Sequence, residues 1–341
     1  LNELANMLAR ELRDLYGIRP GDIVGLMLDR SEWMIVGMLG VIKAGGAYLP
    51  LEPELPGERI GYMLSDSRCN MLILQSEHLL QLEAFDGRLF AIDVQFESLT
   101  QETGNIAPVN CSTDPVYVIY TSGSTGNPKG VPITGRSLLN TEYWRKGFYG
   151  FDECFVTLQY ASFSFDSSVN DIFSALLWGG ALIIPDNHER LEVGRLSQLI
   201  REHGATNFNV VPGLYRSILN DLKDAALPLK VITLAGEKLP EDLVEAHFRV
   251  FPDVKIINEY GPTENAICST ACVIADAQHI DTTIGTPIAN TQVYILDDQL
   301  HPMPVGLAGE ICLSGNGLAD GYLNRPDLTA DRFIPHPFRP A

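Results

Sequence analysis

Residues 120–130, which read YTSGSTGNPKG, bring hydroxyls, glycines and one lysine together in a short stretch. They follow the apolar run at residues 114–119, which favours a buried strand. Glycine lets backbone N–H groups approach an anion closely, and serine and threonine hydroxyls add further donors. The pattern therefore indicates a phosphate-binding loop, and a flexible surface loop is the alternative. No serine or threonine follows Lys129, so the stretch departs from the G-x-x-x-x-G-K-[ST] loop, and a kinase-like or GTPase-like site is disfavoured.

Residues 258–264, which read NEYGPTE, follow an expected strand at residues 255–257. In open α/β sheets, ligands bind beyond the carboxyl ends of the strands. The run offers an amide, an aromatic ring, a hydroxyl and a carboxylate, which suit a purine edge, a purine face, a phosphate and a Mg²⁺ ion. The alternative is a plain Gly-Pro turn with solvated charges.

A third polar stretch, residues 164–169, precedes an apolar helix expected at residues 170–178. Asp166 is either the N-cap of this helix, with Ser167 and Ser168 in the first turn, or a pocket carboxylate that pairs with a substrate ammonium. The residues by themselves leave both interpretations open.

The elements that must position these stretches alternate along the chain. Strands are expected at residues 22–28, 70–75, 181–185, 206–211, 229–235 and 255–257, and helices at residues 31–43, 135–149, 191–203 and 239–251. This alternation predicts stacked parallel sheets with covering helices. After about residue 268, short strands at residues 293–296 and 310–313 predict a small β-rich lobe.

Composition narrows the class of protein. The chain has 341 residues, which suits two or three lobes with sizeable cores, and a net charge of −19. Because so acidic a surface repels phosphate backbones and anionic lipid, nucleic acid and membranes are poor partners. The six cysteines form no C-x-x-C pair, and neither a secretory signal nor a membrane-length apolar run is visible, so we expect a cytoplasmic protein. The first residues already follow a helical pattern with no cap before them, and the last residues follow a loop pattern, so we expect a piece of a longer chain.

Five segments, taken in order, carry a resemblance to a known family. They are KAGGAYLPL at 43–51, YTSGSTGNPKG at 120–130, FSFDSSV at 163–169, NEYGPTE at 258–264 and GEICLSGNGLADGYLNRPDLT at 309–329. Over residues 1–341 the chain resembles the large N-terminal core of an amino-acid adenylation domain of nonribosomal peptide synthetases. That domain belongs to the adenylate-forming superfamily, which includes acyl-CoA synthetases and luciferase. The resemblance implies two stacked, doubly wound, mostly parallel α/β lobes at residues 1–267 and a small β-barrel-like lobe at residues 268–341.

The resemblance also implies a reaction. An amino acid carboxylate attacks the α-phosphate of ATP, and the aminoacyl group then passes to the phosphopantetheine thiol of a carrier protein. Such a step depends on positioning and charge stabilisation. The implied catalytic residues are Lys129, Thr263 and Glu264, and Glu264 is also the implied Mg²⁺ ligand. The implied ATP-binding residues are Thr121, Ser122, Gly123, Ser124, Thr125, Gly126, Gly236, Glu237, Asn258, Tyr260 and Gly261.

The family pairs an aspartate with the α-ammonium of its amino acid, and Asp166 matches that position. The implied substrate pocket consists of Asp166, Ser167, Asn170, Leu214, Thr233, Ala235, Glu259, Ile267 and Cys268. Thr233, Ala235 and Glu259 match the lining of tyrosine-activating members. The positions that depart from that lining are Ser167, Asn170 and Cys268. We therefore expect L-tyrosine or a related aromatic amino acid, and lysine or ornithine paired with Glu259 is the alternative.

Other hypotheses and departures complete the sequence-based interpretation. An acyl- or aryl-CoA ligase of the same superfamily and a non-catalytic docking core are the competing functions. Expected partners are a peptidyl carrier protein, a condensation domain and a small MbtH-like activator. Asp320 stands where the family usually has arginine or lysine. The family's ribose-binding aspartate, hinge and C-terminal lid lie outside the matched segments, so we expect binding to exceed turnover.

Overall fold

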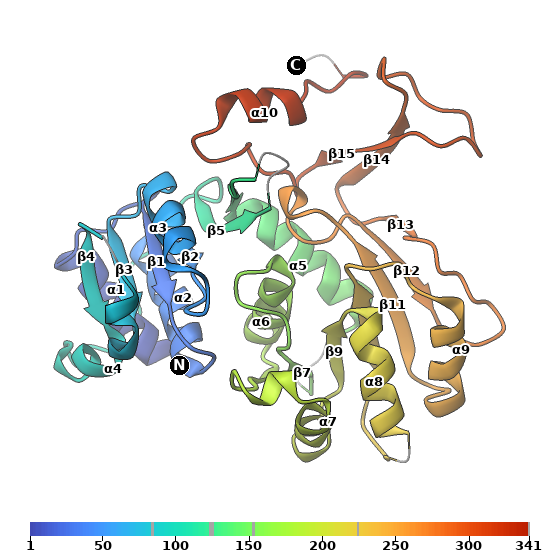
Figure 1. The fold of residues 1–341 in the computed structure, drawn as a ribbon, viewed down its shortest axis with the longest axis horizontal. Helices are drawn as coiled ribbons and strands as arrows, with labels where there is room; N and C mark the ends of the chain where they lie inside the picture. Colours follow the sequence, from blue (N-terminus) through green and yellow to red (C-terminus); the bar gives the residue numbers. More distant parts are fainter. Residues whose placement is uncertain (83–84, 123–125, 152–153, 224, 340–341) are drawn as a thin grey trace.

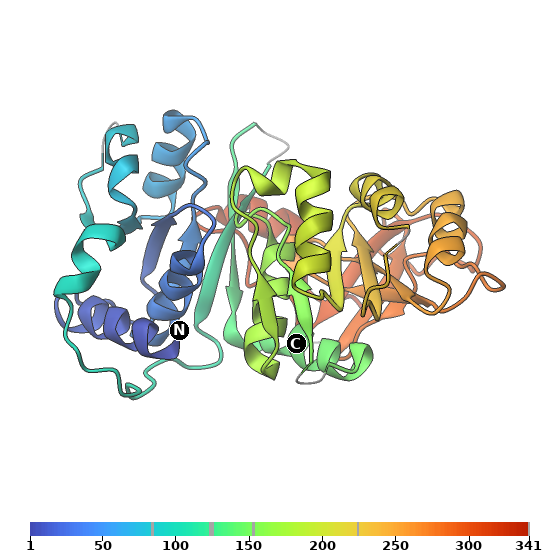
Figure 2. The ribbon, with the colours of Figure 1, turned by 90° about the horizontal axis from the view of Figure 1, so that it is seen from below.

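The structure is a computed structural model that describes residues 1–341 except 83–84, 123–125, 152–153, 224 and 340–341. The described residues form a six-stranded sheet, a seven-stranded sheet and a two-stranded sheet. The two large sheets belong to two lobes that lie side by side, with the chain running from the first lobe into the second (Figures 1 and 2). This arrangement confirms the predicted α/β fold with mostly parallel sheets.

The first lobe is built on a sheet of order β4-β3-β1-β2-β5-β6. Its strands are β1 (Ile23–Met27), β2 (Ala47–Pro50), β3 (Met71–Leu74), β4 (Arg88–Ala91), β5 (Pro115–Thr121) and β6 (Lys129–Thr134). Its helices are α1 (Asn2–Asp14), α2 (Glu32–Ala44), α3 (Gly57–Asp66) and α4 (Ile92–Gln95). The pairs from β4 to β5 are parallel, whereas β6 runs antiparallel to β5. The phosphate-loop sequence therefore joins the two strands of a hairpin.

The second lobe is built on a sheet of order β13-β12-β11-β10-β9-β7-β8. Its strands are β7 (Val156–Leu158), β8 (Ala181–Ile183), β9 (Asn207–Val210), β10 (Val231–Ala235), β11 (Lys255–Tyr260), β12 (Thr270–Ile274) and β13 (Thr286–Pro287). Its helices are α5 (Gly135–Tyr149), α6 (Asp166–Trp178), α7 (Val193–Glu202), α8 (Pro212–Leu222) and α9 (Glu241–Val250). Strand β12 runs antiparallel to both β11 and β13, and the other strand pairs of this sheet are parallel.

The last part of the chain differs from the expected β-barrel-like lobe. Strands β14 (Thr291–Leu296) and β15 (Glu310–Gly315) form a two-stranded antiparallel sheet, and helix α10 (Pro326–Arg332) follows. Two strands cannot close a barrel, and no closed barrel occurs among the described residues. Strands β12 and β13, which also come after residue 268, belong to the second lobe's sheet instead.

One hydrophobic core crosses the boundary between the two lobes. The aromatic rings of Tyr48 and Tyr117 from the first sheet pack in the same buried cluster as Val169 and Ile172 of α6. Tyr48 also stacks on Phe163, with ring centroids 6.2 Å apart and an interplanar angle of 5°. The lobes are therefore joined by continuous apolar packing, which fixes the start of α6 against the first sheet.

A buried arginine adds hydrogen bonds to this contact. Arg30, which follows β1, is only 8% exposed. Its guanidinium donates to the backbone oxygens of Pro185 and Ala161, each at 2.9 Å, and to the backbone oxygen of Gln159. These carbonyls lie just beyond the carboxyl ends of β7 and β8, where a sheet leaves backbone acceptors without partners.

We predict that Arg30→Met lowers the free energy of unfolding by about 2–4 kcal/mol, because three buried carbonyls lose a charged donor. Urea unfolding followed by circular dichroism measures the change. The exposed Arg59 of α3 provides the matched control, and Arg59→Met is expected to change stability by less than about 0.5 kcal/mol. Equal effects of the two substitutions would contradict the role given to Arg30.

Candidate active site

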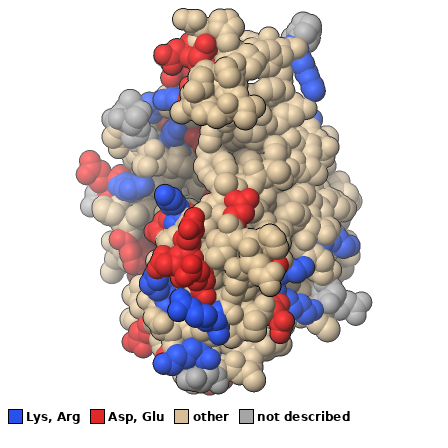
Figure 3. All heavy atoms as spheres, turned by 90° about the vertical axis from the view of Figure 1, so that its right-hand side faces the viewer, with Lys and Arg blue, Asp and Glu red and all other residues tan. Residues whose placement is uncertain are grey.

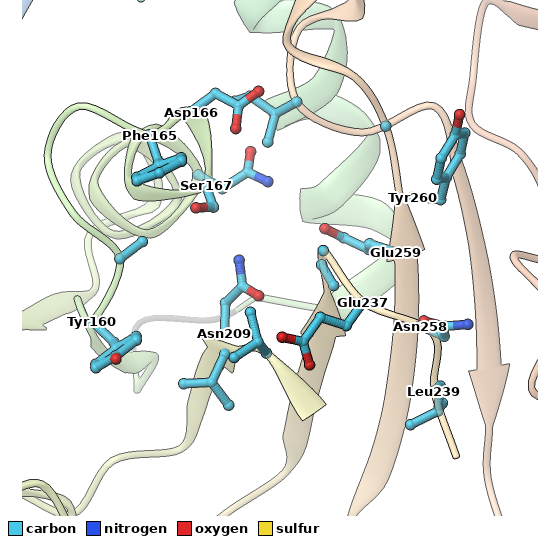
Figure 4. A pocket seen from close by; sticks show the side chains of 18 of the residues that line it. Tyr160, Phe165, Asp166, Ser167, Asn209, Glu237, Leu239, Asn258, Glu259 and Tyr260 are labelled. Atoms are coloured by element: carbon cyan, nitrogen blue, oxygen red, sulfur yellow. The ribbon is translucent and has the colours of Figure 1, made fainter. Parts of the chain in front are cut away.

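One large cavity lies in the second lobe, beyond the carboxyl ends of its parallel strands. Its volume is about 860 Å³. Many residues singled out from the sequence line it together (Figure 4). They are Asp166, Ser167, Asn170, Ala235, Gly236, Glu237, Asn258, Glu259, Tyr260, Gly261 and Ile267. The cavity thus brings the expected nucleotide residues and the expected substrate residues to one place.

Strand β11 extends to Tyr260, so Asn258, Glu259 and Tyr260 lie on the strand rather than after it. Side chains on a strand alternate between its two faces. Figure 4 accordingly shows Glu259 pointing to one side of β11 and Asn258 and Tyr260 to the other. The Asn258 amide donates to the backbone oxygen of Thr283 at 2.8 Å, which leaves its side-chain oxygen to accept from a purine amino group.

Two glycines allow a ligand and the backbone to approach closely. Gly236 follows β10 with a φ of +83°, a conformation that other residues rarely adopt. A Cβ atom at Gly261 would lie 2.2 Å from the backbone oxygen of Ile267. Ile267 itself has a φ of +81°, which is strained for a β-branched residue. The cavity wall at this point is therefore held in a conformation that only a few sequences can adopt.

Asp166 begins α6 and is partly exposed to the cavity while lying deep within the protein. Burial raises the pKa of its carboxyl to about 6, although hydrogen bonds from the Thr263 hydroxyl and the backbone of Ser167 oppose this shift. The preceding residue, Phe165, is the N-cap of α6 and makes no side-chain cap. Asp166 is therefore placed as a pocket carboxylate in the first helical turn, where the helix dipole favours a negative charge.

Two of the expected catalytic residues, Lys129 and Glu264, form a compact hydrogen-bonded group with Tyr322. Lys129 Nζ lies 2.8 Å from Glu264 Oε1 and 2.7 Å from the hydroxyl of Tyr322, which also donates to Glu264 Oε1 at 2.8 Å. Burial raises the pKa of Glu264, but the bonds from Lys129 and Tyr322 outweigh it, so the pKa lies below its ordinary value. Tyr322 was not singled out from the sequence.

This group connects the phosphate-loop hairpin to the cavity. Lys129 pairs with Thr121 across the hairpin of β5 and β6, and it bonds Glu264, whose neighbour Thr263 bonds Asp166. The Thr121 hydroxyl is buried and has no hydrogen-bond partner among the described residues, which leaves it available to a ligand. Ser122 is exposed and Gly126 has a φ of +92°. Three further expected loop residues, Gly123, Ser124 and Thr125, lie outside the described residues.

The group also suits one magnesium ion. Glu264 Oε1 already accepts two hydrogen bonds, and no hydrogen bond to Oε2 occurs in the described part of the chain. One carboxylate oxygen is a typical protein contribution to Mg²⁺, which takes its remaining ligands from phosphates and water. Glu264 therefore fits as a magnesium ligand alongside a bound triphosphate.

A buried charged network lies behind the cavity, on the Glu259 face of β11. Arg145 of α5 donates to Glu259 Oε1 at 2.5 Å, and the Tyr149 hydroxyl donates to the same oxygen at 2.5 Å. Tyr149 also bonds the Thr233 hydroxyl at 2.9 Å. The side chains of Arg145 and Glu259 are 1% and 4% exposed. Glu259, expected to face the substrate, is therefore already paired with a cation.

The network continues along α5 and α6. Glu142 accepts from the Ser174 hydroxyl at 2.8 Å, and Arg145 Nε donates to the same hydroxyl at 3.3 Å. With its amide oriented to satisfy both neighbours, Asn170 donates to Glu142 and accepts from Arg145, each at 3.2 Å. Burial raises the pKa of Glu142 to about 8, although Arg145 opposes the shift. The neutral form of Glu142 therefore persists to higher pH than that of an exposed glutamate.

Three expected substrate residues do not line the cavity among the described residues. Thr233 lies behind it and bonds Tyr149, and Cys268 is buried with its thiol 3.4 Å from the backbone oxygen of Thr270. Leu214 is half-buried on α8. Asp320 is exposed, and nothing in the structure explains why it differs from the family pattern.

The sequence analysis also missed three residues of the buried network, Arg145, Glu142 and Tyr149. On a helix, Glu142 and Arg145 have the i, i+3 spacing of an ordinary surface ion pair. Only their burial against β11 reveals the role.

Comparison with known proteins agrees with this geometry. The family model described as AMP-binding enzyme matches residues 1–323. The chain belongs to the AMP-binding enzyme family. It is 45% identical to bacitracin synthase 3 of Bacillus licheniformis and 43% identical to tyrocidine synthase 3 of Brevibacillus parabrevis, with 100% of the chain matched in each case. The chain spans about 5% of the length of these relatives. It is therefore similar to one adenylation core within very long synthetases.

Solved structures lead to the same family. The nonribosomal peptide synthetase FmoA3 in its α-methyl-L-serine-AMP bound form is 29% identical, with a TM-score of 0.91 over 98% of this chain and 38% of that chain. An FmoA3 structure with AMPPNP is also similar, with a TM-score of 0.90, 30% identity and coverage of 98% of this chain and 36% of that chain. The N-terminal subdomain of Klebsiella oxytoca NpsA, in complex with 3-hydroxybenzoyl-AMSN, covers 99% of this chain and 83% of its own, with 27% identity and a TM-score of 0.85. The expected fold and family are thereby confirmed.

Two observations concern membranes and nucleic acid, which the sequence indicates to be poor partners. In the described part of the chain, no helix has the length and apolar character needed to cross a membrane. The face shown in Figure 3 carries acidic and basic side chains intermixed, without a continuous basic area.

The buried network predicts a pH dependence of stability. The carboxyl of Glu142 has a folded-state pKa of about 8, above the ordinary value of 4.5, so the folded state binds more protons between these values. The free energy of unfolding must therefore fall as the pH rises from about 5 to 8. Glu142→Gln keeps an acceptor for Ser174 and removes this term, so at pH 8.5 the variant is expected to be more stable than wild type by about 1–2 kcal/mol.

Urea unfolding at pH 6 and pH 8.5 measures this effect. The exposed Glu245 of α9 supplies the control variant Glu245→Gln, which should follow the wild type at both values. A Glu142→Gln variant that loses as much stability as wild type between pH 6 and 8.5 would show that Glu142 is not the titrating group.

Proposed function

We propose that this chain activates an amino acid by forming its aminoacyl adenylate from ATP. The observation that carries the proposal is that Asp166 and the purine-side residues Asn258 and Tyr260 open onto a single cavity. The Asp166 carboxylate suits the α-ammonium of an amino acid. The face of β11 that carries Asn258 and Tyr260 suits adenine. The similarity to adenylate-forming ligases supports the same reaction class.

In the proposed reaction, a carboxylate oxygen of the amino acid attacks the α-phosphorus of ATP. A new P–O bond forms as the bond to the β-phosphate oxygen breaks, and pyrophosphate leaves. Because both reactants are anions, the site must hold them together and offset their repulsion. Lys129 places an ammonium next to Glu264. The hydroxyl of Thr263, the residue before Glu264, hydrogen-bonds the Asp166 carboxylate. Magnesium, when bound at Glu264, adds positive charge beside the phosphates.

The side chain of the amino acid is the finer part of the proposal. Ala235 and Ile267 provide apolar walls, and Glu259 offers a polar group, which favours L-tyrosine or a related aromatic amino acid. Lysine or ornithine is less favoured, because Arg145 already pairs with the carboxylate that would bind the second cation. An acyl- or aryl-CoA ligase is disfavoured by Asp166, since such substrates carry no ammonium.

Further steps follow from the relatives rather than from the cavity. As part of a peptide synthetase, the core would pass its aminoacyl group to the phosphopantetheine thiol of a carrier protein. A neighbouring condensation domain and an MbtH-like activator would be its other partners.

Asp166→Asn is expected to abolish recognition of the ammonium. The measurement is calorimetric titration with a non-hydrolysable tyrosyl-adenylate analogue and with its desamino counterpart. Wild type should bind the tyrosyl analogue about 100-fold more tightly, a difference that one charge-assisted, partly buried hydrogen-bonded pair can supply. In Asp166→Asn the two analogues should bind alike, while the exposed Asp253→Asn control should behave as wild type.

Equal binding of both analogues to wild type would favour the CoA-ligase hypothesis. Binding of neither analogue beyond that of adenosine would favour the docking core.

The same pair predicts a pH profile. Only the ionised carboxylate of Asp166 attracts an ammonium, and burial raises its pKa to about 6. Affinity for the tyrosyl analogue is therefore expected to be constant above about pH 7 and to fall by roughly tenfold per pH unit well below 6. Titrations of the tyrosyl and desamino analogues at pH 5, 6, 7 and 8 test this, because the desamino analogue should show no such fall. A profile that is equally flat for both would contradict the assignment.

A further inference from the structure

We propose that Arg145 selects the class of substrate side chain. It does so by fixing and neutralising Glu259, so that the site accepts a neutral hydrogen-bond donor and disfavours a second ammonium. The side chains of this class with a ring are phenol, imidazole and indole. The inference rests on the proposed amino-acid activation and adds a residue of α5 that no comparison and no motif assigns.

The first step concerns the two oxygens of Glu259. Oε1 accepts from both Arg145 and Tyr149. No hydrogen bond to Oε2 is found within the described residues, although Glu259 lines the cavity. Figure 4 shows the Glu259 side chain directed to the same side of β11 as Ser167 and Asn209. Among the described residues, Glu259 Oε2 is therefore an acceptor without a partner at the cavity wall, in addition to the carboxylates of Asp166 and Glu237, which also line the cavity.

The second step concerns charge. Arg145 is the largest fully buried side chain of the molecule's described part, and it carries the positive charge that Glu259 balances. Burial favours the neutral forms of the other acids near it, because it raises the pKa of Glu142 to about 8 and that of Asp171 well above its ordinary value. Arg145 and Glu259 themselves form a buried ion pair. An ammonium entering beside Glu259 would meet a balanced pair and the repulsion of Arg145.

The third step concerns three other polar groups, the side chains of Asn170, Thr233 and Asn209. The Asn170 amide is occupied by Glu142 and Arg145, and the Thr233 hydroxyl is occupied by Tyr149. Asn209 also lines the cavity, but an amide both donates and accepts, so it favours neither class of side chain. Compared with these three groups, Glu259 Oε2 is an acceptor that cannot donate, so it distinguishes a donor from an apolar ring. The Glu237 carboxylate, which also lines the cavity, accepts from the backbone N–H of Gly213 at 3.3 Å.

The apolar walls complete the selection. Ala235 and Ile267 line the same cavity, and Ile267 is held in place by its strained backbone beside Gly261. A flat ring can lie between such walls while its edge reaches a carboxylate oxygen. A ring without a donor fills the same space but leaves Oε2 desolvated without a partner, which is unfavourable.

The test uses the full chain and non-hydrolysable aminoacyl-adenylate analogues titrated by calorimetry. The analogues carry the side chains of tyrosine, histidine, tryptophan, phenylalanine, lysine and ornithine. In wild type, at least one ring with a donor should bind about tenfold or more tightly than the phenylalanine analogue, and lysine and ornithine should bind no more tightly than phenylalanine. Tighter binding of lysine or ornithine than of every ring donor would overturn the inference.

Two variants locate the effect. In Glu259→Gln, the advantage of the donor rings over phenylalanine should fall to less than about threefold, because the acceptor-only oxygen is lost. In Arg145→Met, Glu259 loses its counter-ion, and lysine and ornithine should gain about tenfold relative to phenylalanine. Arg145→Lys keeps the charge and should retain the rejection of cations, and Arg216→Met, at a surface pair with Asp242, is the control expected to match wild type.

Folding of each variant is checked by circular dichroism and thermal unfolding. If Arg145→Met does not fold, Glu259→Gln decides, and a full donor advantage in that variant overturns the inference. The outcome is separable from the proposed function. Analogues that bind in an Asp166-dependent manner without any side-chain preference refute the inference alone, whereas analogues that bind no better than adenosine refute the proposed function itself.

Discussion

The guanidinium of Arg145 is buried, so the elements around it must supply partners for its positive charge. A cation taken out of water is very unfavourable unless partners surround it. Here β11 supplies Glu259, α6 supplies Ser174 and Asn170, and α5 supplies the ring of Tyr149, whose centroid lies 4.4 Å from the guanidinium carbon. Because each partner must sit at a fixed distance, the network fixes how α5 and α6 pack against the sheet. The cavity beyond it therefore has a rigid polar wall, as selective binding requires.

In the proposed function, the pleat of strand β11 separates adenine recognition from recognition of the substrate side chain. Asn258 and Tyr260 share one face and Glu259 takes the other. Residues on the nucleotide face can stay the same while residues on the side-chain face vary, since neighbouring positions on a strand point in opposite directions. The hairpin of β5 and β6 connects the two lobes. Its strands belong to the first sheet, and the side chain of Lys129 in β6 bonds Glu264, which comes after the last residue of β11 in the second lobe.

The sequence predicted much of this architecture and part of the site. The helix at residues 135–149 was predicted with the bounds that α5 has, because glycine and its neighbours end it at Gly150 in a left-handed conformation. The strand at residues 255–257 was predicted too short, since polar residues at its end resemble a loop. Arg145 and Tyr322 were missed because their partners lie far away in the chain. No local pattern distinguishes a buried arginine on a helix from an exposed one.

The contacts of Arg30 have a consequence for recombination between related synthetases. Three of its acceptors beyond β7 and β8 are main-chain carbonyls, at Gln159, Ala161 and Pro185, and a further acceptor is the side-chain oxygen of Gln159. Every sequence supplies main-chain oxygens, so most of these contacts do not depend on the side chains of the receiving segment. A second lobe taken from a relative could therefore keep the main-chain contacts of Arg30 whatever residue stands at position 159. Exchange of the segments that carry the pocket is thus compatible with these contacts between the two lobes.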